Sequence, residues 1–185
     1  MEEHKSKKTF AREIILPDGV EALFSGGFLK IKGRKGDVER KIEWNIKVRI
    51  ENSAIYLESG KGTQKDKKII GSVEAHVKNM VRGVLDCHRY TLKICSGHFP
   101  MSVSASGNKV VVKNFLGEKV PRALEFSKNA KVTVEGDLVC VESPDKETAG
   151  QISAGIEQLT RRPGYDMRVF QDGIWIINKD GKEIK

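Results

Sequence analysis

Residues 71–80, GSVEAHVKNM, return in altered form at residues 150–159, GQISAGIEQL. Apolar residues occupy the same places in both stretches. The larger ones, at positions 73, 77 and 80 and at positions 152, 156 and 159, recur at spacings of four and three, which is the pattern of an amphipathic helix with one apolar stripe. The matched residues are Val73, Ala75, Val77 and Met80 in the first stretch and Ile152, Ala154, Ile156 and Leu159 in the second. The sequence therefore predicts two related helices.

Further blocks recur in the same order on either side of these helices. FLKIKGRKG (28–36) resembles KVVVKNFLG (109–117), and both alternate apolar residues before a loop that ends in glycine. IYLES (55–59) likewise resembles VCVES (139–143). The series ends with a pair of arginines, Arg89 and Arg168. Blocks that recur in order indicate a duplicated module of about 80 residues.

Each module combines short strands with one helix. Residues 20–51 alternate polar and apolar side chains, which is typical of antiparallel strands buried on one face. The first helical stripe begins near Lys65, and Ser143-Pro144 with Glu147 reads as the start of the second helix. The predicted fold class is α+β, a tandem duplication of a small antiparallel β-sheet module with one packed α-helix per copy.

The boundary between the modules should follow the first helix, near Gly83. The strand-like segment RYTLKI (89–94) comes soon afterwards, and no stretch rich in proline or serine separates the two. We therefore expect residues 1–83 to form the first module and residues 84–185 the second, joined stiffly.

Charge and composition narrow the class of protein. The chain has 33 basic and 25 acidic residues and a net charge of +8, which favours a polyanionic partner such as nucleic acid or an anionic membrane surface. There is no apolar run of about 18 residues, and the first ten residues, MEEHKSKKTF, lack the apolar stretch of a secretory signal. We therefore expect a cytoplasmic protein without a membrane partner.

The cysteines and histidines suggest a metal site only superficially. The candidate ligands are Cys87, His88, Cys95 and His98. Zinc ligands come in two closely spaced pairs that meet at one ion, whereas a strand-like segment holds the pair 87–88 apart from the pair 95–98. Three cysteines, with Cys140, do not indicate a disulfide framework. We expect reduced cysteines, no metal and no cofactor; a metal or redox protein built on this set is the weaker alternative.

Motifs of catalysis are missing, since the chain has no G-x-S-x-G, H-E-x-x-H or G-x-G-x-x-G. The glycine-rich stretch SGKGT (59–63) departs from the Walker pattern, which needs an earlier glycine and a Ser or Thr directly after the lysine. We expect no enzyme. This stretch and the lysines after it read as a mobile cationic loop, either a solvated turn or a secondary RNA contact through Lys61, Lys65, Lys67 and Lys68.

Residues 161–179, RRPGYDMRVFQDGIWIINK, are the best candidate for RNA binding. Arginine reaches phosphate in a bidentate manner, and aromatic rings stack on bases or on arginine. We expect Phe170 and Trp175 to be strand residues that face the core. For the arginines, the alternative is a solvated surface. The candidate RNA contacts in this stretch are Arg161, Arg162, Tyr165 and Arg168.

Four segments resemble the L-six family of large-subunit ribosomal proteins, in its archaeal and eukaryotic form, whose eukaryotic members carry the number nine. They are HVKNMVRGV (76–84), GHFPMSV (97–103), NFLGEK (114–119) and RVFQDGIWI (168–176). The glycine- and lysine-rich ending of the bacterial branch, with KGKG, is missing. Trp175 departs from the tyrosine or phenylalanine usual in the family.

The resemblance implies two copies of one α+β module in a structural protein of the ribosome, acting in translation. Family members lie near the sarcin–ricin loop and the stalk base, at the translation-factor site, and the second module is the main binder of ribosomal RNA. The implied partners are large-subunit rRNA and neighbouring ribosomal proteins, not DNA. To the three arginines the resemblance adds the C-terminal lysines Lys179, Lys182 and Lys185. The alternative is a free-standing RNA-binding protein that uses the same module twice.

Overall fold

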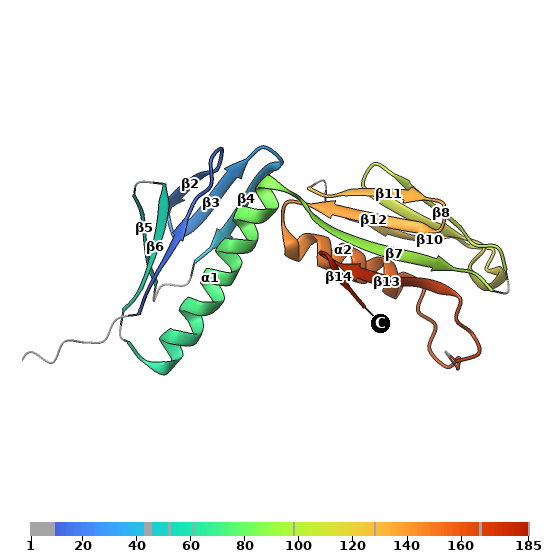
Figure 1. The fold of residues 1–185 in the computed structure, drawn as a ribbon. Coiled ribbons are helices and arrows are strands. Elements are labelled where there is room, and N and C mark those ends of the chain that lie inside the picture. The colour runs from blue at the N-terminus through green and yellow to red at the C-terminus, as the bar shows by residue number, and fades with distance from the viewer. Residues whose placement is uncertain are drawn as a thin grey trace, which may run out of the picture. The chain divides into compact units, whose positions relative to one another are not determined.

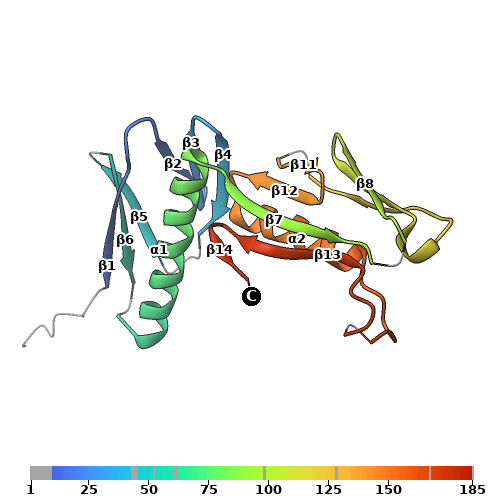
Figure 2. The ribbon, with the colours of Figure 1, turned by 45° about the vertical axis from the view of Figure 1, so that its right-hand side comes forward.

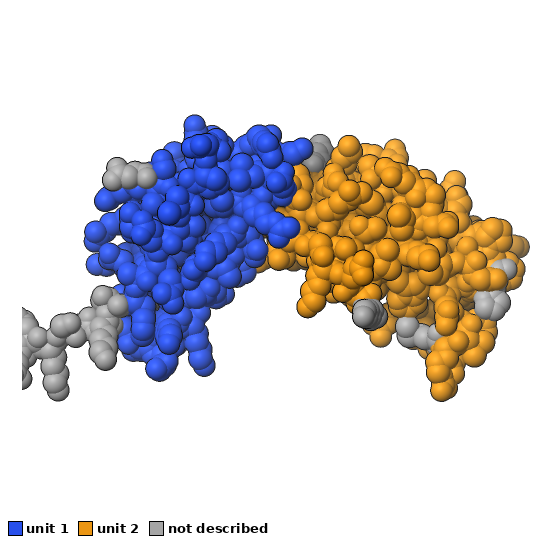
Figure 3. Space-filling view, in the orientation of Figure 1, with its two compact units in different colours: residues 1–86 blue, residues 87–185 orange. Residues whose placement is uncertain are grey.

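The computed structural model describes residues 10–42, 46–51, 53–60, 62–97, 99–127, 129–166 and 168–184. The chain folds into two units, residues 1–86 and 87–185, each built around its own hydrophobic core (Figures 1 and 3). The division falls shortly after the expected boundary at Gly83. Helix α1 (Gln64–Leu85) continues past this glycine because Val84 is fully buried in the core.

The first unit contains two antiparallel sheets of three strands, in the orders β1-β6-β5 and β2-β3-β4. Helix α1 packs against strands of both sheets. The strands are β1 (Ala11–Ile15), β2 (Glu21–Ser25), β3 (Phe28–Gly33), β4 (Gly36–Lys41), β5 (Ile46–Glu51) and β6 (Ala54–Ser59).

The second unit repeats this plan and extends it. Its sheets have the orders β10-β9-β8 and β11-β12-β7-β13-β14, and helix α2 (Lys146–Leu159) lies across the larger sheet (Figures 1 and 2). The elements are β7 (His88–Cys95), β8 (Ser102–Ser106), β9 (Lys109–Lys113), the 3₁₀ turn η1 (Phe115–Gly117), β10 (Arg122–Glu125), β11 (Lys131–Glu135), β12 (Leu138–Ser143), β13 (Gly173–Lys179) and β14 (Lys182–Glu183).

The topology confirms the duplication. In chain order, strands β7 to β12 correspond to strands β1 to β6, and each keeps the same sheet neighbours as its counterpart. Each module holds two small sheets where the sequence suggested one, because an alternating pattern marks a buried face without naming the partner strand. The match of Arg89 with Arg168 is wrong: Arg89 lies in β7, whereas Arg168 lies in the loop after α2, which has no counterpart among residues 10–86 that the structure describes.

Both helices bury the predicted stripe, and α1 starts at Gln64, next to the predicted Lys65, whereas α2 starts two residues later than the sequence suggested. Val77 and Ile156 are fully buried at the centres of the two cores. Thr63 begins α1 through a capping box with Asp66. Asp145, not Ser143, caps α2, because Asp145 accepts hydrogen bonds from two free backbone N–H groups of the first turn while Ser143 ends strand β12.

Among the described residues, no helix combines the length and the apolar character needed to cross a membrane.

Because each unit has its own core, truncation of a core side chain should destabilise only the unit that contains it. Ile156→Ala should destabilise the second unit by about 2–5 kcal/mol and Ile70→Ala the first unit by a similar amount, because each change empties a fully buried site. Amide hydrogen exchange reports this unit by unit. The exposed Leu23→Ala is the control. Equal loss of protection in both units from either core substitution would contradict the prediction.

Candidate functional site

A loop that leaves the C-terminus of α2 and returns to β13 carries the predicted arginines. We call residues 160–166 and 168–172 the arginine loop; it projects beyond the Gly173 end of β13 (Figures 1 and 2). Its first turn is formed by Pro163, whose ring fixes φ, and Gly164, whose φ of 86° falls in the left-handed region that glycine adopts without strain. The sequence therefore restricts the shape of the loop directly after the helix.

Stacked side chains stiffen the loop further. The Arg162 guanidinium lies 4.5 Å from the centre of the Tyr165 ring. The edge of that ring meets Phe170 with a centroid distance of 5.0 Å and an interplanar angle of 80°. Cation–π and aromatic contacts of this kind each contribute about 0.5–1.5 kcal/mol. The loop thus holds Arg162 and Tyr165 in place while Tyr165 stays 41% exposed.

The other two arginines of the loop differ in their surroundings. Arg161 is exposed, and its side chain has no ion-pair or hydrogen-bond partner within the described residues. Arg168 is also exposed but forms a bidentate pair with Asp166, with Nε–Oδ1 and Nη2–Oδ2 distances of 3.1 and 2.9 Å. These hydrogen bonds lower the pKa of Asp166 and raise that of Arg168. Because so exposed a pair adds little stability, an anion can displace the carboxylate.

Arg122, which the sequence analysis missed, fixes the helix end from which the loop departs. Its Nε and Nη2 donate to the two carboxylate oxygens of Glu118 at 2.8 and 2.7 Å, and its Nη1 donates to the backbone oxygen of Leu159 at 2.7 Å. The guanidinium also lies 4.6 Å from the centre of the buried Phe115 ring. Arg122 thereby satisfies the last carbonyl of α2 and joins it to the segment before β10.

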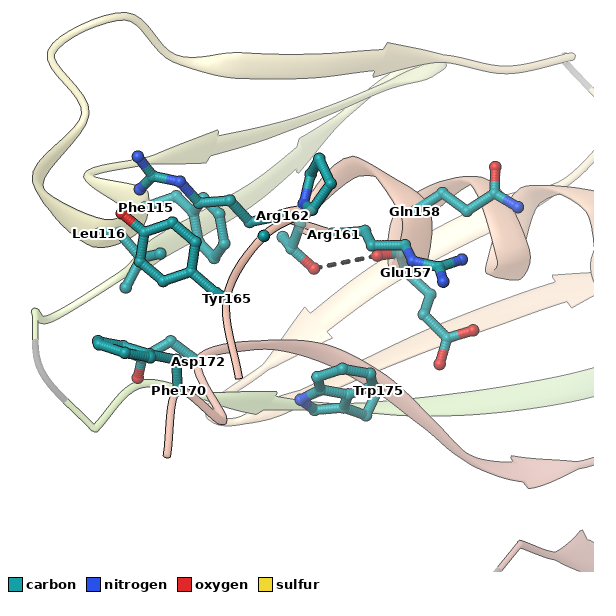
Figure 4. A pocket seen from close by; sticks show the side chains of 13 residues that line it. Phe115, Leu116, Glu157, Gln158, Arg161, Arg162, Tyr165, Phe170, Asp172 and Trp175 are labelled. Carbon is teal, nitrogen blue, oxygen red and sulfur yellow. Dashed lines mark hydrogen bonds between the residues drawn. The ribbon is translucent and has the colours of Figure 1, made fainter. Parts of the chain in front are cut away.

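A hollow of about 520 Å³ lies beside the arginine loop within the second unit (Figure 4). Its walls come from η1, from the last turn of α2, from the loop itself and from Trp175 in β13. The expectation that Phe170 and Trp175 face the core is wrong. Phe170 lies in the loop against Tyr165, and Trp175 lines the hollow while its strand neighbour Ile174 takes the core position.

The open edge of β13 is covered by side chains from the last turn of α2 and from Thr160, the residue that caps its C-terminus. The Ile174 N–H donates to the Thr160 hydroxyl at 2.9 Å, and the Ile176 N–H donates to Glu157 Oε1 at 3.3 Å. Both donors lie in the part of β13 whose outer edge has no neighbouring strand, since β14 pairs only with Asn178 and Lys179 at the C-terminal end of β13. These hydrogen bonds close the base of the arginine loop.

The predicted tail lysines lie elsewhere. Lys179 and Lys182 face each other in the β13–β14 hairpin, at the end of β13 opposite to Gly173. Because a seven-residue strand spans roughly 20 Å, they do not join the arginines in one site. The hairpin is held by Asp180, which contacts the fully buried His88 at 3.0 Å and Lys146 at 3.5 Å. Lys185 lies outside the described residues.

The second predicted cationic segment is a helix start, not a mobile loop. Lys65, Lys67 and Lys68 are exposed residues of the first turns of α1, and the Thr63–Asp66 capping box orders them. The backbone that carries Lys65, Lys67 and Lys68 is therefore already ordered before these lysines contact an anion. Lys61 lies outside the described residues.

Within the described part of the chain, no group of three or more His, Cys, Asp or Glu residues is placed to hold a metal ion. Cys87, Cys95 and Cys140 are free thiols, and Cys140 accepts a hydrogen bond from Arg89 at 3.3 Å. His88 turns its Nδ1 to Asp180. His98 lies outside the described residues.

Comparison with known proteins agrees with this arrangement. The model of the family described as ribosomal protein L6 matches residues 16–86 and 99–173, one match in each unit. The chain is 41% identical over 169 residues to a protein of Methanobrevibacter smithii, covering 91% of this chain and 95% of the relative. It is 42% identical over 181 residues to a protein of Nanoarchaeum equitans, covering 93% and 94%. Both relatives are named large ribosomal subunit protein uL6.

The Glu118–Arg122 pair predicts acid sensitivity of the second unit. Hydrogen bonds from Arg122 hold the pKa of Glu118 below its ordinary value of 4.5, so the pair stabilises the fold above that pH and the stabilisation is lost as pH falls through the lowered pKa. Denaturant unfolding of the wild type and of Glu118→Gln should therefore differ at neutral pH and converge at strongly acidic pH. Glu125→Gln, in β10, is the control; a constant difference at every pH would contradict the prediction.

Proposed function

The chain belongs to the ribosomal protein L6 family, and from this premise we propose that it is a structural constituent of the large subunit of the cytoplasmic ribosome, not an enzyme. Its partners are large-subunit rRNA and neighbouring ribosomal proteins. Its place is near the sarcin–ricin loop and the stalk base, at the translation-factor site, with the second unit as the main RNA binder.

The arginine loop is the observation that carries this proposal. Arg161, Arg162 and Arg168 stand on one short loop whose shape is restricted by a Pro-Gly turn and by the stack on Tyr165. Guanidinium groups bind phosphates in a bidentate manner, and a loop already shaped loses little entropy on contact. Phosphate neutralisation with recognition of RNA shape is therefore the mechanism that these residues support best.

The lysines of α1 are the competing site. They are preordered on a helix N-terminus, whose partial positive charge adds to their own. We still rank the arginine loop first, because lysine offers a point charge where arginine offers paired donors, and because the loop adds the exposed Tyr165 ring for stacking.

A salt titration against a large-subunit RNA fragment with the sarcin–ricin loop compares the two sites. Changing Arg161, Arg162 and Arg168 to alanine should weaken binding more than changing Lys61, Lys65, Lys67 and Lys68 to alanine. Removal of each phosphate contact should reduce the salt slope by roughly 0.7–0.9. Alanine changes at the exposed Lys47, Lys113 and Lys131 control for charge alone. A larger loss of affinity in the lysine variant would assign the main RNA site to the first unit.

Co-sedimentation separates the ribosomal role from that of a free-standing RNA-binding protein. A constituent stays with the large subunit through a high-salt wash, because many contacts hold it at once. Recovery of the chain in the free fraction would favour the free-standing alternative.

The Asp166 carboxylate should weaken RNA binding in the wild-type protein, because it competes with phosphate for the Arg168 guanidinium. Asp166→Asn keeps the Oδ1 acceptor that the Arg168 backbone N–H uses, and it removes the negative charge that competes with phosphate. We expect tighter RNA binding and a salt slope steeper by about 0.7–0.9, as one more phosphate contact forms. The exposed Asp137→Asn removes the same charge in the β11–β12 turn and should leave the slope unchanged. Unaltered binding by Asp166→Asn would show that Arg168 makes no phosphate contact.

A further inference from the structure

The hollow beside the arginine loop has the size and the walls of a small-ligand site. Its volume of about 520 Å³ falls within the roughly 300–1,000 Å³ typical of such sites. Figure 4 shows Trp175 on one side, Tyr165 and Phe170 on another, and Glu157 on the helix side. The walls therefore combine aromatic faces with two carboxylates, those of Glu157 and Asp172, and Asp172 already accepts a hydrogen bond from the Gly97 N–H.

Trp175 can be covered by a flat ligand without losing a hydrogen bond. Its indole N–H already donates to the backbone oxygen of Gln171 at 3.1 Å, which also fixes the orientation of the ring. A half-buried aromatic ring with its polar atom satisfied is suited to stacking, and every nucleobase has a face that stacks on such a ring.

Glu157 supplies the polar recognition. Its Oε1 accepts from the Ile176 N–H, which holds the carboxylate in place, and its Oε2 has no hydrogen-bond partner within the described residues. A carboxylate only accepts hydrogen bonds, and each oxygen accepts two. The Watson–Crick edge of guanine presents two adjacent donors, N1–H and N2–H, whereas the edges of the other bases place an acceptor beside a single donor.

The rim of the hollow carries cationic side chains that can bind the RNA backbone on either side of an inserted base. Arg161 and Arg162 belong to its lining, and the Arg162 guanidinium is held on Tyr165 at the hollow's edge. The phosphates on either side of an inserted base would lie against these groups. The positive charge of the rim therefore favours RNA over an apolar small molecule as the ligand.

We propose that this hollow takes one unpaired base of the bound RNA, stacked on Trp175, and that Glu157 selects guanine. The inference rests on the proposed function, because it concerns the RNA that the arginine loop binds. It adds a base-specific contact to recognition otherwise made through phosphates and shape.

Pentaribonucleotides test the proposal at low salt. UUGUU, UUAUU, UUCUU and UUUUU are titrated into the full-length protein, and NMR follows the indole N–H of Trp175, which Trp44→Phe distinguishes from the second tryptophan. We expect UUGUU to shift the Trp175 signal and to bind at least about fivefold tighter than UUUUU, which is the lower range of discrimination by one bidentate contact to a base edge.

Glu157→Gln separates recognition from structure. Glutamine keeps the oxygen acceptor for the Ile176 N–H but replaces one acceptor with a donor. The variant should fold normally, retain binding to the pentamers and lose the preference for guanine. The exposed Glu135→Gln, in β11, should keep that preference.

The outcomes distinguish a failure of the proposed base site from a failure of the proposed function. Binding of the sarcin–ricin loop fragment without any shift of Trp175 by the pentamers would overturn the base site and leave the proposed function standing. Equal shifts and affinities with UUGUU and UUUUU would overturn the role of Glu157. No binding to any of these RNAs would overturn the base site and the RNA-binding part of the proposed function together.

Discussion

The hydrogen bond from the Ile174 N–H to the Thr160 hydroxyl is the contact on which the whole site depends. Strand β13 has an open edge at this point, and a buried N–H left without a partner costs about 1–3 kcal/mol. Thr160, together with Glu157, supplies the partners from the end of α2. The arginine loop between α2 and β13 is thereby closed at its base, so its arginines are carried on a fixed loop and not on a free tail.

The sequence was sufficient for those parts of the fold that periodicity encodes. The stripes through Val77 and Ile156 repeat at helical spacing, and both residues are at the centres of the cores. The split of each module into two sheets was not predictable, since alternation along one strand does not say which strand donates to it. The exact first residue of α1 was also within reach, because Thr63 and Asp66 have the spacing of a capping box.

The site was predictable only where its residues are neighbours in sequence. Arg162 and Tyr165 meet because a Pro-Gly turn brings them together, and Arg161 directly precedes Arg162 in the chain. Arg122 was not found, because its bond to the Leu159 carbonyl depends on how β10 packs against α2. Glu157 resembled any polar helix residue until β13 was placed beside it. The family resemblance grouped Lys179 with the arginines, but strand β13 separates Lys179 from them by its full length.

The position of β13 in the sheet sets an order of events during synthesis on the ribosome that makes this chain. Strand β7, made early in the second unit, pairs with β12 and with β13, whose residues are added long afterwards. The first unit has all its strands and its helix once residue 86 has emerged, whereas the second lacks a sheet strand until residue 179 follows. The arginine loop therefore reaches its closed form late, and a nascent chain that still lacks β13 carries these arginines without the geometry described above.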